Sequence, residues 1–588
     1  MAEKKSDFVP PVITPAELAG ILQRFGSPSQ KKEIAACQAH CPSSGAQGSE
    51  ASCNRNFSDS VVRLLAPSSS ETASDKPGQE RGNDGEGSNG QARVFLFDAS
   101  WTHLPMFGGR DGLKEYRESA RLPHAVFFDI EECSDTEQTY PHMMPSSVDF
   151  AFYLERKAHE YKARMHAVSE NKEEGRPPSH TSGKVASAEV DPKRDIFVVY
   201  DGVGLFAAPR VYFMLTVFGC KNAFVLDGGI KRWIAEGYPI ESGPISDGVS
   251  TEELKSTGHS HKAKEGEEGN DGGFGRERGK SYPGEKAGKM IQATAKACTD
   301  ALRALSFHSG SHSGASKSPA RHGEEPRDAQ KQNVIGVSLD TSRVVEYENI
   351  LSVIEKAKAA NDEKEPIAPD VEDTEDMSPD RVAAAAIPGV PLLVDARLPG
   401  RFKGEQPEPR PCIPSGHIPT SMNLPFTEVV NIHRYTKAKG GTVVDHLSPF
   451  STSTDAPFAY HTLKRGSELK QALEPVLRRA GNCSSSGDDS KKDEKKIFLT
   501  CGSGMTACIL YVALVQAGVH PDCLAVYDGS WAEYAERRLL EARGEGITPA
   551  LSEEQAGEWK KKIMECRASG SMDEFTVPPG ETIAEAVA

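Results

Sequence analysis

The residue with the clearest chemical potential in this chain is a cysteine at the junction of a strand and a helix. The apolar run Lys496–Thr500 leads into the loop Cys501–Thr506, and the helical run Cys508–Leu514 follows. Successive backbone N–H groups in such a turn converge on one point, and the helix N-terminus adds a partial positive charge, so a thiolate is stabilised there. Cys501 is therefore a candidate nucleophile. The spaced Gly502 and Gly504 weigh against the alternative, a buried structural cysteine.

The elements that would position this cysteine occur twice. In each half, one apolar run ends in Asp-Ala and a second run ends in a loop with two glycines. The paired segments are Val94–Trp101 with Leu392–Arg397, Ile196–Gly204 with Phe498–Gly504, Phe224–Gly229 with Ala525–Ser530, and the helical runs Pro209–Phe218 with Thr506–Gln516. Strands that alternate with helices in this way favour two doubly wound α/β domains with central, mostly parallel sheets.

Each half also opens with a segment that leads into a helix. These openings lie at Pro11 and at Val337–Thr341, each with a Thr or Asp as the candidate N-cap. Between the patterned segments run long low-complexity stretches, which we expect to be insertions and a linker. The expected divisions are an N-terminal domain at 8–245 with insertions at about 27–91 and 169–194, a disordered linker at 246–333, a C-terminal domain at 334–545 with insertions at about 361–380 and 483–495, and a tail at 546–588.

Composition limits the class of protein. The 588 residues exceed the size of a single core, about 250–300 residues. The net charge of −16 argues against nucleic acid or an anionic membrane as partner, and no apolar run is long enough to span a bilayer. The 12 cysteines include no CxxC pair, which suits reduced thiols. The start Met1–Asp7 has no apolar signal core, so a cytoplasmic location is expected, with a mitochondrial pool left open.

The two copies are chemically unequal. When Gly204 is aligned with Gly504, Asp201 falls where the second copy has Cys501. A carboxylate cannot act as a thiol nucleophile, and Asp201 is expected to cap the helix that follows it. The chemistry is therefore expected at the loop of the second half.

This loop and its neighbours resemble the tandem-rhodanese family of 3-mercaptopyruvate sulfurtransferases. The resemblance is carried by Cys501–Thr506, Val526–Tyr534, Leu392–Arg397 and Gly416–Pro419, which together span most of the second half. It implies two rhodanese-like domains, of which the first is catalytically silent and completes the wall of the site. It also implies a transferase that carries sulfur as a Cys501 persulfide and needs no metal or organic cofactor.

The resemblance further implies substrate-binding residues. Arg401 and Arg410, nine positions apart in a loop after the strand that ends at Arg397, match the arginines that bind the carboxylate and keto oxygens of mercaptopyruvate. Guanidinium groups bind planar carboxylates in this way. Arg397 is expected to pair with an acid inside its own domain. The persulfide is expected to contact the backbone of the loop, at Gly502, Ser503, Gly504, Met505 and Thr506.

A proton relay is also implied by the resemblance. Its members are Ser503 in the loop, His142 in the first half and a carboxylate that falls on Glu131, where the family usually has Asp. Asp129 is the other candidate for the acid, and a structural histidine at the domain interface is the alternative for His142. A second departure is His124 in Arg121–Ala125, where rhodanese domains commonly have glycine.

The expected reaction moves sulfur from 3-mercaptopyruvate through Cys501 to a thiol acceptor such as thioredoxin, or to cyanide, and releases pyruvate. The nearest alternative is a thiosulfate sulfurtransferase, which typically carries an Arg-Lys pair after the cysteine, where this chain has the neutral Gly502 and Ser503. A rhodanese-like phosphatase would need an arginine where Ala507 stands. A non-catalytic rhodanese scaffold is the alternative from another class.

Overall fold

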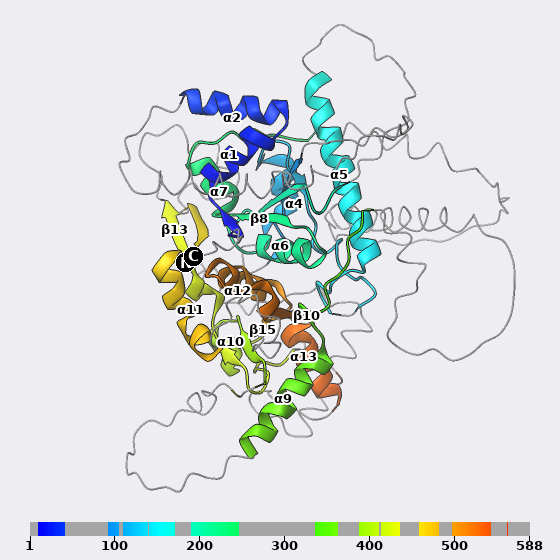
Figure 1. The fold of residues 1–588 in the computed structure, drawn as a ribbon, viewed down its shortest axis with the longest axis vertical. Helices are drawn as coiled ribbons and strands as arrows, with labels where there is room; N and C mark the ends of the chain where they lie inside the picture. The colour runs from blue at the N-terminus through cyan, green and yellow to red at the C-terminus, as the bar shows by residue number, and fades with distance from the viewer. Residues whose placement is uncertain are drawn as a thin grey trace, which may run out of the picture. The chain divides into compact units, whose positions relative to one another are not determined.

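The computed structural model describes residues 10–40, 92–104, 110–138, 140–170, 190–245, 335–362, 387, 389–410, 413–435, 458–480, 497–541 and 561. All of them fall in one compact unit, made of Met1–Ser246 and Asp328–Ala588. Figure 1 shows the elements in chain order. The expected linker 246–333, the expected insertion 483–495 and the expected tail 546–588 lie outside the described residues, apart from Lys561.

The first half is built on a five-stranded parallel sheet with the strand order β1-β8-β7-β2-β6. The strands of this half, inside and outside the main sheet, are β1 (Val12–Ile13), β2 (Val94–Asp98), β3 (Thr102–Leu104), β4 (Arg110–Asp111), β5 (Ala120–Arg121), β6 (Val126–Phe127), β7 (Ile196–Tyr200), β8 (Asn222–Leu226) and β9 (Glu241–Ser242). Its helices are α1 (Pro15–Phe25), α2 (Pro28–His40), α4 (Gly112–Glu118), α5 (Ser147–Glu170), α6 (Ala208–Val217) and α7 (Gly229–Ala235). Two small antiparallel pairs, β3 with β4 and β5 with β9, lie outside the main sheet.

The second half repeats this sheet with the order β10-β16-β15-β11-β12, again parallel throughout. Its strands are β10 (Val344–Val345), β11 (Leu392–Asp395), β12 (Met422–Asn423), β13 (Val430–Tyr435), β14 (Phe458–Leu463), β15 (Ile497–Thr500) and β16 (Leu524–Tyr527). Its helices are α9 (Tyr347–Asp362), α10 (Pro399–Lys403), α11 (Gly466–Ala480), α12 (Met505–Gln516) and α13 (Ser530–Leu540), with short 3₁₀ turns at Phe426–Val429 and Pro521–Cys523. The expected fold class, two doubly wound α/β domains, is confirmed.

The local signals have clear physical causes. The central strands β2 and β7 are buried at every residue, as a parallel sheet covered on both faces requires. Thr14 caps α1 in a reciprocal arrangement with Glu17, as expected of the first opening. The expected cap of the second opening is wrong, because Asp340 accepts from Ser342 in a turn and the helix begins only at Tyr347.

Two further features differ from the expectation. The segment assigned to an insertion at 27–91 begins with helix α2, and Gln30 of this helix is buried. The antiparallel hairpin β13–β14 was not predicted at all. Among the described residues, no helix is both long and apolar enough to cross a membrane.

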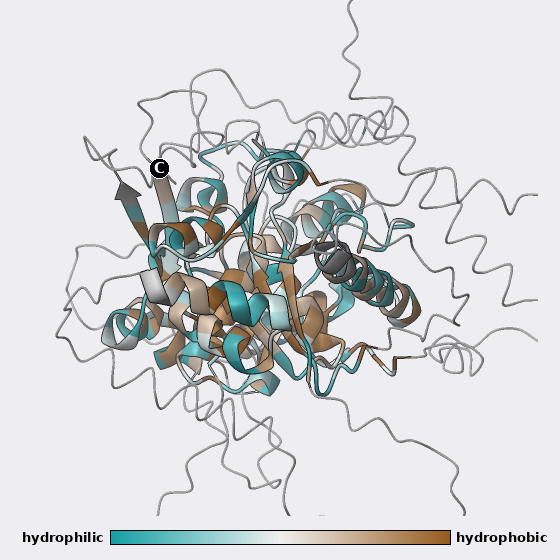
Figure 2. Cartoon of the chain, turned by 90° about the horizontal axis from the view of Figure 1, so that it is seen from above, coloured by the Kyte–Doolittle hydropathy of each residue, from teal (hydrophilic) through white to brown (hydrophobic). Residues whose placement is uncertain are grey.

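The two halves pack through their loop-bearing helices, α6 and α12, which lie side by side in Figure 1. The Phe213 and Tyr511 rings meet there at 4.9 Å between centroids. One core cluster runs through both halves, and Figure 2 shows hydrophobic residues, in brown, gathered toward the middle of the cartoon. Burial of this shared apolar surface is the main term holding the halves together.

Each half also closes the glycine loop of the other. Hairpin strand β14 covers the loop of the first half, where Leu463 N–H donates to Asp227 Oδ1 at 2.8 Å. In the second half, Met144 N–H donates to Asp528 Oδ2. Because Asp227 and Asp528 follow the equivalent strands β8 and β16, the two contacts are related by the repeat.

Candidate active site

Cys501 lies directly after β15, with 2% of its surface exposed. Gly504 ends the loop with a left-handed φ of 78°, which a residue without Cβ adopts at low cost, and α12 starts at Met505. Ser530 stands behind the loop, and its hydroxyl accepts from the N–H groups of Cys501 at 3.2 Å and Gly504 at 3.0 Å. The cysteine thus sits at the N-terminal end of a helix, as the sequence predicted.

The loop of the first half shows what this backbone can bind. The Asp201 carboxylate accepts five backbone N–H groups at 2.6–2.9 Å, from Val203, Gly204, Phe206, Ala207 and Ala208. Of these donors only Ala208 belongs to α6, whose N-cap is Ala207 and which has no side-chain cap. Asp201 therefore binds the loop that leads into the helix, and the expectation that it caps the helix is wrong. The repeat places Ser503, Gly504, Thr506, Ala507 and Cys508 at the same positions around Cys501. In the second half the helix begins earlier, at Met505, so the N–H groups of Thr506 and Ala507 lie in the first turn of α12 and favour an anion at the end of the Cys501 side chain.

Two arginines lie against the residue after the cysteine. A Cβ built on Gly502 would lie 2.9 Å from Arg401 Nη2 and 3.9 Å from Arg410 Nη1. Arg401 is held by Glu408, which accepts from its Nε at 3.2 Å and also from its Nη2. Burial, followed by the charge of Arg401, lowers the pKa of Arg410 to about 10, so Arg410 is still cationic at neutral pH.

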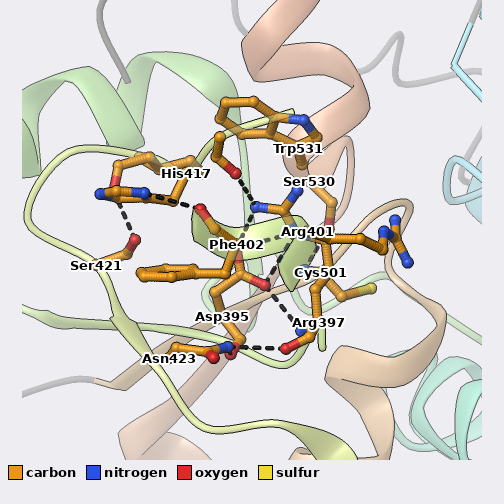
Figure 3. A network of polar contacts seen from close by, with 12 residues as sticks. Asp395, Arg397, Arg401, Phe402, His417, Ser421, Asn423, Cys501, Ser530 and Trp531 are labelled. Atoms are coloured by element: carbon orange, nitrogen blue, oxygen red, sulfur yellow. Dashed lines mark hydrogen bonds and ion pairs between the residues drawn. The ribbon is translucent and has the colours of Figure 1, made fainter. Parts of the chain in front are cut away.

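Arg397 belongs to the structure of the domain, as expected. Its guanidinium donates to Asp395 and to Glu408, both at 2.7 Å, and stacks over the Trp531 ring. Figure 3 shows this network beside Cys501 and Arg401. Arg397 thereby fixes Glu408, which in turn fixes Arg401.

His142 reaches the site from the first half. Its Nε2 lies 3.3 Å from Arg410 Nη2, and its Nδ1 lies 3.1 Å from Glu131 Oε1. Because an arginine can only donate, the nitrogen that faces it carries no proton, and the proton of the neutral ring lies on Nδ1, toward Glu131. Burial lowers the pKa of His142 against the opposing effect of Glu131, so the ring is neutral at pH 7.

The two candidate acids play different parts. Glu131 contacts His142 and also accepts from Trp101 Nε1 at 2.8 Å. Although burial opposes it, the contact with His142 holds the pKa of Glu131 below its usual range. Asp129 instead accepts the backbone N–H groups of Glu131 and Glu132 at 3.0 and 3.3 Å. The structure therefore brings Glu131, not Asp129, to the histidine.

Ser503 completes a chain of contacts across the site. Arg410 Nη2 donates to Ser503 Oγ at 3.0 Å, so one guanidinium joins the cysteine loop to His142. Thr506 is half-buried, whereas Met505 is buried in the core. His124, the second departure from the family pattern, lies elsewhere in a left-handed conformation with φ 62°, where glycine would be less strained.

Several residues at the site were missed by sequence reasoning: Trp101, Glu408, Ser530, Arg210 and Asp528. Trp101 packs edge-on against the His142 ring at 4.8 Å between centroids. Only Ser530 and Asp528 carried a usable signal, since both fall in the Asp-Gly-Ser segment that the repeat singled out. Four described cysteines, Cys133, Cys220, Cys501 and Cys508, are free thiols. In the described part of the chain, no group of His, Cys, Asp or Glu has the arrangement of a metal site.

Known proteins similar to this chain are sulfurtransferases. The 3-mercaptopyruvate sulfurtransferase of Rattus norvegicus is 27% identical over 459 residues, which cover 77% of this chain and 90% of that protein. The thiosulfate sulfurtransferase of Cricetulus griseus is 25% identical over 452 residues, which cover 76% and 87%. An Arabidopsis thaliana protein named thiosulfate/3-mercaptopyruvate sulfurtransferase 1, mitochondrial, is 24% identical over 440 residues, which cover 75% and 71%.

Among solved structures, the crystal structure of SseA from Escherichia coli, described as a 3-mercaptopyruvate sulfotransferase with the rhodanese fold, is 19% identical with a TM-score of 0.36. The match covers 74% of this chain and 92% of that one. No family model matches the chain. Relatives named for either sulfur donor match over nearly the same share of the chain, so the similarity itself does not separate the donors.

Proposed function

We propose that this chain is a sulfurtransferase with tandem rhodanese-like domains, which transfers the sulfur of 3-mercaptopyruvate through Cys501 to a thiol acceptor. Relatives at 25–27% identity over 76–77% of the chain support this proposal. The observation that carries the proposal is the pair of guanidinium groups, from Arg401 and Arg410, that flank Gly502 next to the cysteine. Two adjacent cations suit a substrate with a carboxylate and a keto oxygen.

The first step forms the persulfide. The Cys501 thiolate attacks the substrate sulfur, the bond between that sulfur and C3 breaks, and its electron pair remains on the carbon as the enolate of pyruvate. Arg401 and Arg410 orient the carboxylate and stabilise the charge that develops on the keto oxygen. The proton of the substrate thiol is then transferred to C3, which leaves pyruvate and a Cys501 persulfide anion.

Proton movement falls to His142 and Ser503. The neutral His142 ring presents an unprotonated Nε2, and Glu131 stabilises the charge that the ring gains when it takes a proton. The Ser503 hydroxyl and His142 Nε2 both contact the guanidinium of Arg410. When Arg410 turns to the substrate carboxylate, both groups are released toward the reacting sulfur.

The persulfide anion would lie in the backbone N–H groups of the loop, as the Asp201 carboxylate does in the first half. A thiolate acceptor, with thioredoxin the family's expectation, attacks the outer sulfur. The S–S bond breaks and its electron pair returns to the Cys501 sulfur, which restores the thiolate. In an assay, cyanide takes the sulfur as thiocyanate.

Thiosulfate is the second candidate donor. A cation at position 502 would suit a dianion, but Arg401 Nη2 already occupies the space that a side chain on Gly502 would fill. A larger residue there would displace the arginine that the keto acid uses. This crowding favours the keto acid over thiosulfate.

The test compares pyruvate release from 3-mercaptopyruvate with thiocyanate formation from thiosulfate and cyanide. The variants are Cys501→Ser and, as a matched control, Cys508→Ala, which removes a buried thiol from the first turns of α12. We expect the native protein and Cys508→Ala to prefer 3-mercaptopyruvate and Cys501→Ser to be inactive with both donors. A preference for thiosulfate would overturn the donor, activity in Cys501→Ser would overturn the persulfide, and a fully inactive native protein would favour the scaffold.

We also propose a cytoplasmic location with a mitochondrial pool as the alternative, since one relative carries the word mitochondrial in its name. Cell fractionation followed by immunodetection tests it. Protein confined to the mitochondrial fraction would overturn it.

A further inference from the structure

Arg210 is a buried cation that comes from the domain without the reactive cysteine. It lies in α6, and none of its surface is exposed. Its Nη2 donates to Asp528 Oδ1 at 2.7 Å and to the main-chain carbonyl of His142. Its Nη1 lies 3.0 Å from the position that a Cβ on Gly504 would take. One guanidinium therefore touches both sides of the centre, although the reaction described above does not use it.

The charge on this side chain is costly to keep. Neither Nε nor Nη1 has a hydrogen-bond partner among the residues that the structure describes, whereas buried polar atoms normally have one. Burial works against the charge, but Asp528 raises the pKa of Arg210 above its usual value. A buried ion pair of this kind rarely contributes stability beyond an apolar pair of similar size. The presence of this ion pair is better explained by the backbone that it positions.

The segment from His142 to Met144 is what it positions. His142 has a left-handed φ of 64°, a conformation that a side chain with Cβ adopts only when its surroundings hold it. Arg210 holds the carbonyl of His142, and Asp528 holds the N–H of Met144 two residues later. This ion pair therefore holds both ends of the backbone that aims the His142 ring at Glu131 and Arg410, and Asp135 N–H donates to the Met143 carbonyl between them at 3.0 Å.

We propose that Arg210 is a positioning residue for sulfur transfer, which holds the His142 turn of one half and the Gly504 turn of the other in register. This inference rests on the proposed function, in which His142 moves the proton. Through this side chain the first domain contributes to the centre, although Arg210 contacts Cys508 of α12 and not the nucleophile Cys501.

The repeat supplies a matched control. Asp227 follows β8 as Asp528 follows β16, and it pairs with Arg232 at 2.7 Å, the distance of the Arg210 pair. Asp227 also accepts a backbone N–H from the opposite half, that of Leu463. The two pairs share an Arg–Asp contact of 2.7 Å, although Arg232 is partly exposed and also donates to Glu236, and of the two only the Arg210 pair lies at the loop that carries a cysteine.

The experiment compares Arg210→Lys with Arg232→Lys in the full chain. Lysine keeps the positive charge beside the aspartate but lacks the planar guanidinium that can also donate to a second acceptor. For Arg210→Lys we expect kcat for pyruvate release to fall about 30-fold with KM within about twofold, and the acid limb of the pH profile of kcat/KM to shift. Arg232→Lys is expected to retain the native kcat and profile. Arg210→Met, assayed together with its thermal unfolding, is expected to lose at least as much kcat per folded molecule.

A purely structural role would lower the melting temperature of Arg210→Lys while leaving kcat and the pH profile unchanged, and this result would overturn the inference. An equal loss in Arg232→Lys would overturn it as well. Alkylation of Cys501 by iodoacetamide, followed by mass spectrometry, needs no substrate and separates this inference from the proposed function. If the native protein releases no pyruvate, slower alkylation in Arg210→Lys alone still supports the positioning role, and equal rates in all three proteins refute it.

Discussion

Arg410 donates a 3.0 Å hydrogen bond from Nη2 to the Ser503 hydroxyl, and this contact joins the substrate-binding loop to the cysteine loop. The same nitrogen lies 3.3 Å from His142 Nε2, so one side chain contacts two of the three members of the relay. Its removal should therefore affect binding and turnover together.

We predict that Arg410→Ala lowers kcat/KM for 3-mercaptopyruvate about 100-fold, with a higher KM and a lower kcat, because a charge-assisted contact to the substrate is lost. Steady-state pyruvate release measures the effect. Arg478→Ala, at a side chain that is 72% exposed on α11, is the control and should leave kcat/KM unchanged. An unchanged value for Arg410→Ala would remove this residue from the site.

Gly502→Ala should raise KM about tenfold, which corresponds to about 1.4 kcal/mol. The added Cβ would lie 2.9 Å from Arg401 Nη2 and push the guanidinium away from its place. Gly20→Ala adds a methyl group where no atom lies within 4 Å and serves as the control. If KM for Gly502→Ala stays at the native value, Arg401 does not bind substrate from this position.

The pH dependence should report His142. Burial holds the pKa of folded His142 below its ordinary value of 6.5, so the ring is the neutral base at pH 7 and kcat/KM should fall only at more acidic pH. Stability has the same sign: below about pH 6.5 the unfolded chain takes up a proton that the folded protein refuses, so the free energy of unfolding falls with falling pH. His142→Gln should lower activity and remove this part of both profiles. If the pH profile of kcat/KM for His142→Gln keeps the same acid limb, that limb belongs to a group other than His142.

The acid of the relay can be identified by a pair of isosteric changes. Glu131→Gln removes the charge beside His142 Nδ1 and should lower kcat about tenfold. Asp129→Asn keeps an oxygen for the two backbone N–H groups and should change kcat by less than about twofold. Rapid-quench or steady-state pyruvate assays suffice. The reverse order of effects would return the role to Asp129.

Asp201→Ala should destabilise the protein by about 3 kcal/mol without loss of kcat, because five backbone N–H groups lose their acceptor. Urea unfolding monitored by fluorescence measures this change. Asp111→Ala at the exposed N-cap of α4 should cost only about 1 kcal/mol. If the two variants lose equal amounts of unfolding free energy, the Asp201 carboxylate does not stabilise its loop beyond an ordinary N-cap.

Much of this architecture could be predicted from the sequence because the information is local. Buried parallel strands such as Ile196–Tyr200 appear as unbroken apolar runs, and the glycine pairs mark the loops that follow them. Each of these patterns occurs in both halves of the sequence, and alignment of the halves shows that Asp201 occupies the position of Cys501. The helix N-terminus at the cysteine follows from the same local pattern.

The parts that escaped prediction depend on contacts between distant residues. Arg210 contacts Asp528, which lies 318 positions away, and the sequence around either residue does not predict this contact. The hairpin strands Val430–Tyr435 and Phe458–Leu463 are far apart in sequence, so no turn signal joins them. Trp101 and Glu408 act by holding other side chains, a role that composition and spacing do not express.

The reciprocal closure of the two glycine loops has a consequence for the covalent link between the halves. Asp227 and Asp528 each accept a backbone N–H from the opposite half. The geometry of the active site is therefore determined by the interface between the two halves. The link then contributes mainly an effective concentration, which depends on its length and stiffness and not on its particular residues. We therefore expect a change in the length or composition of this link to leave the chemistry at Cys501 the same.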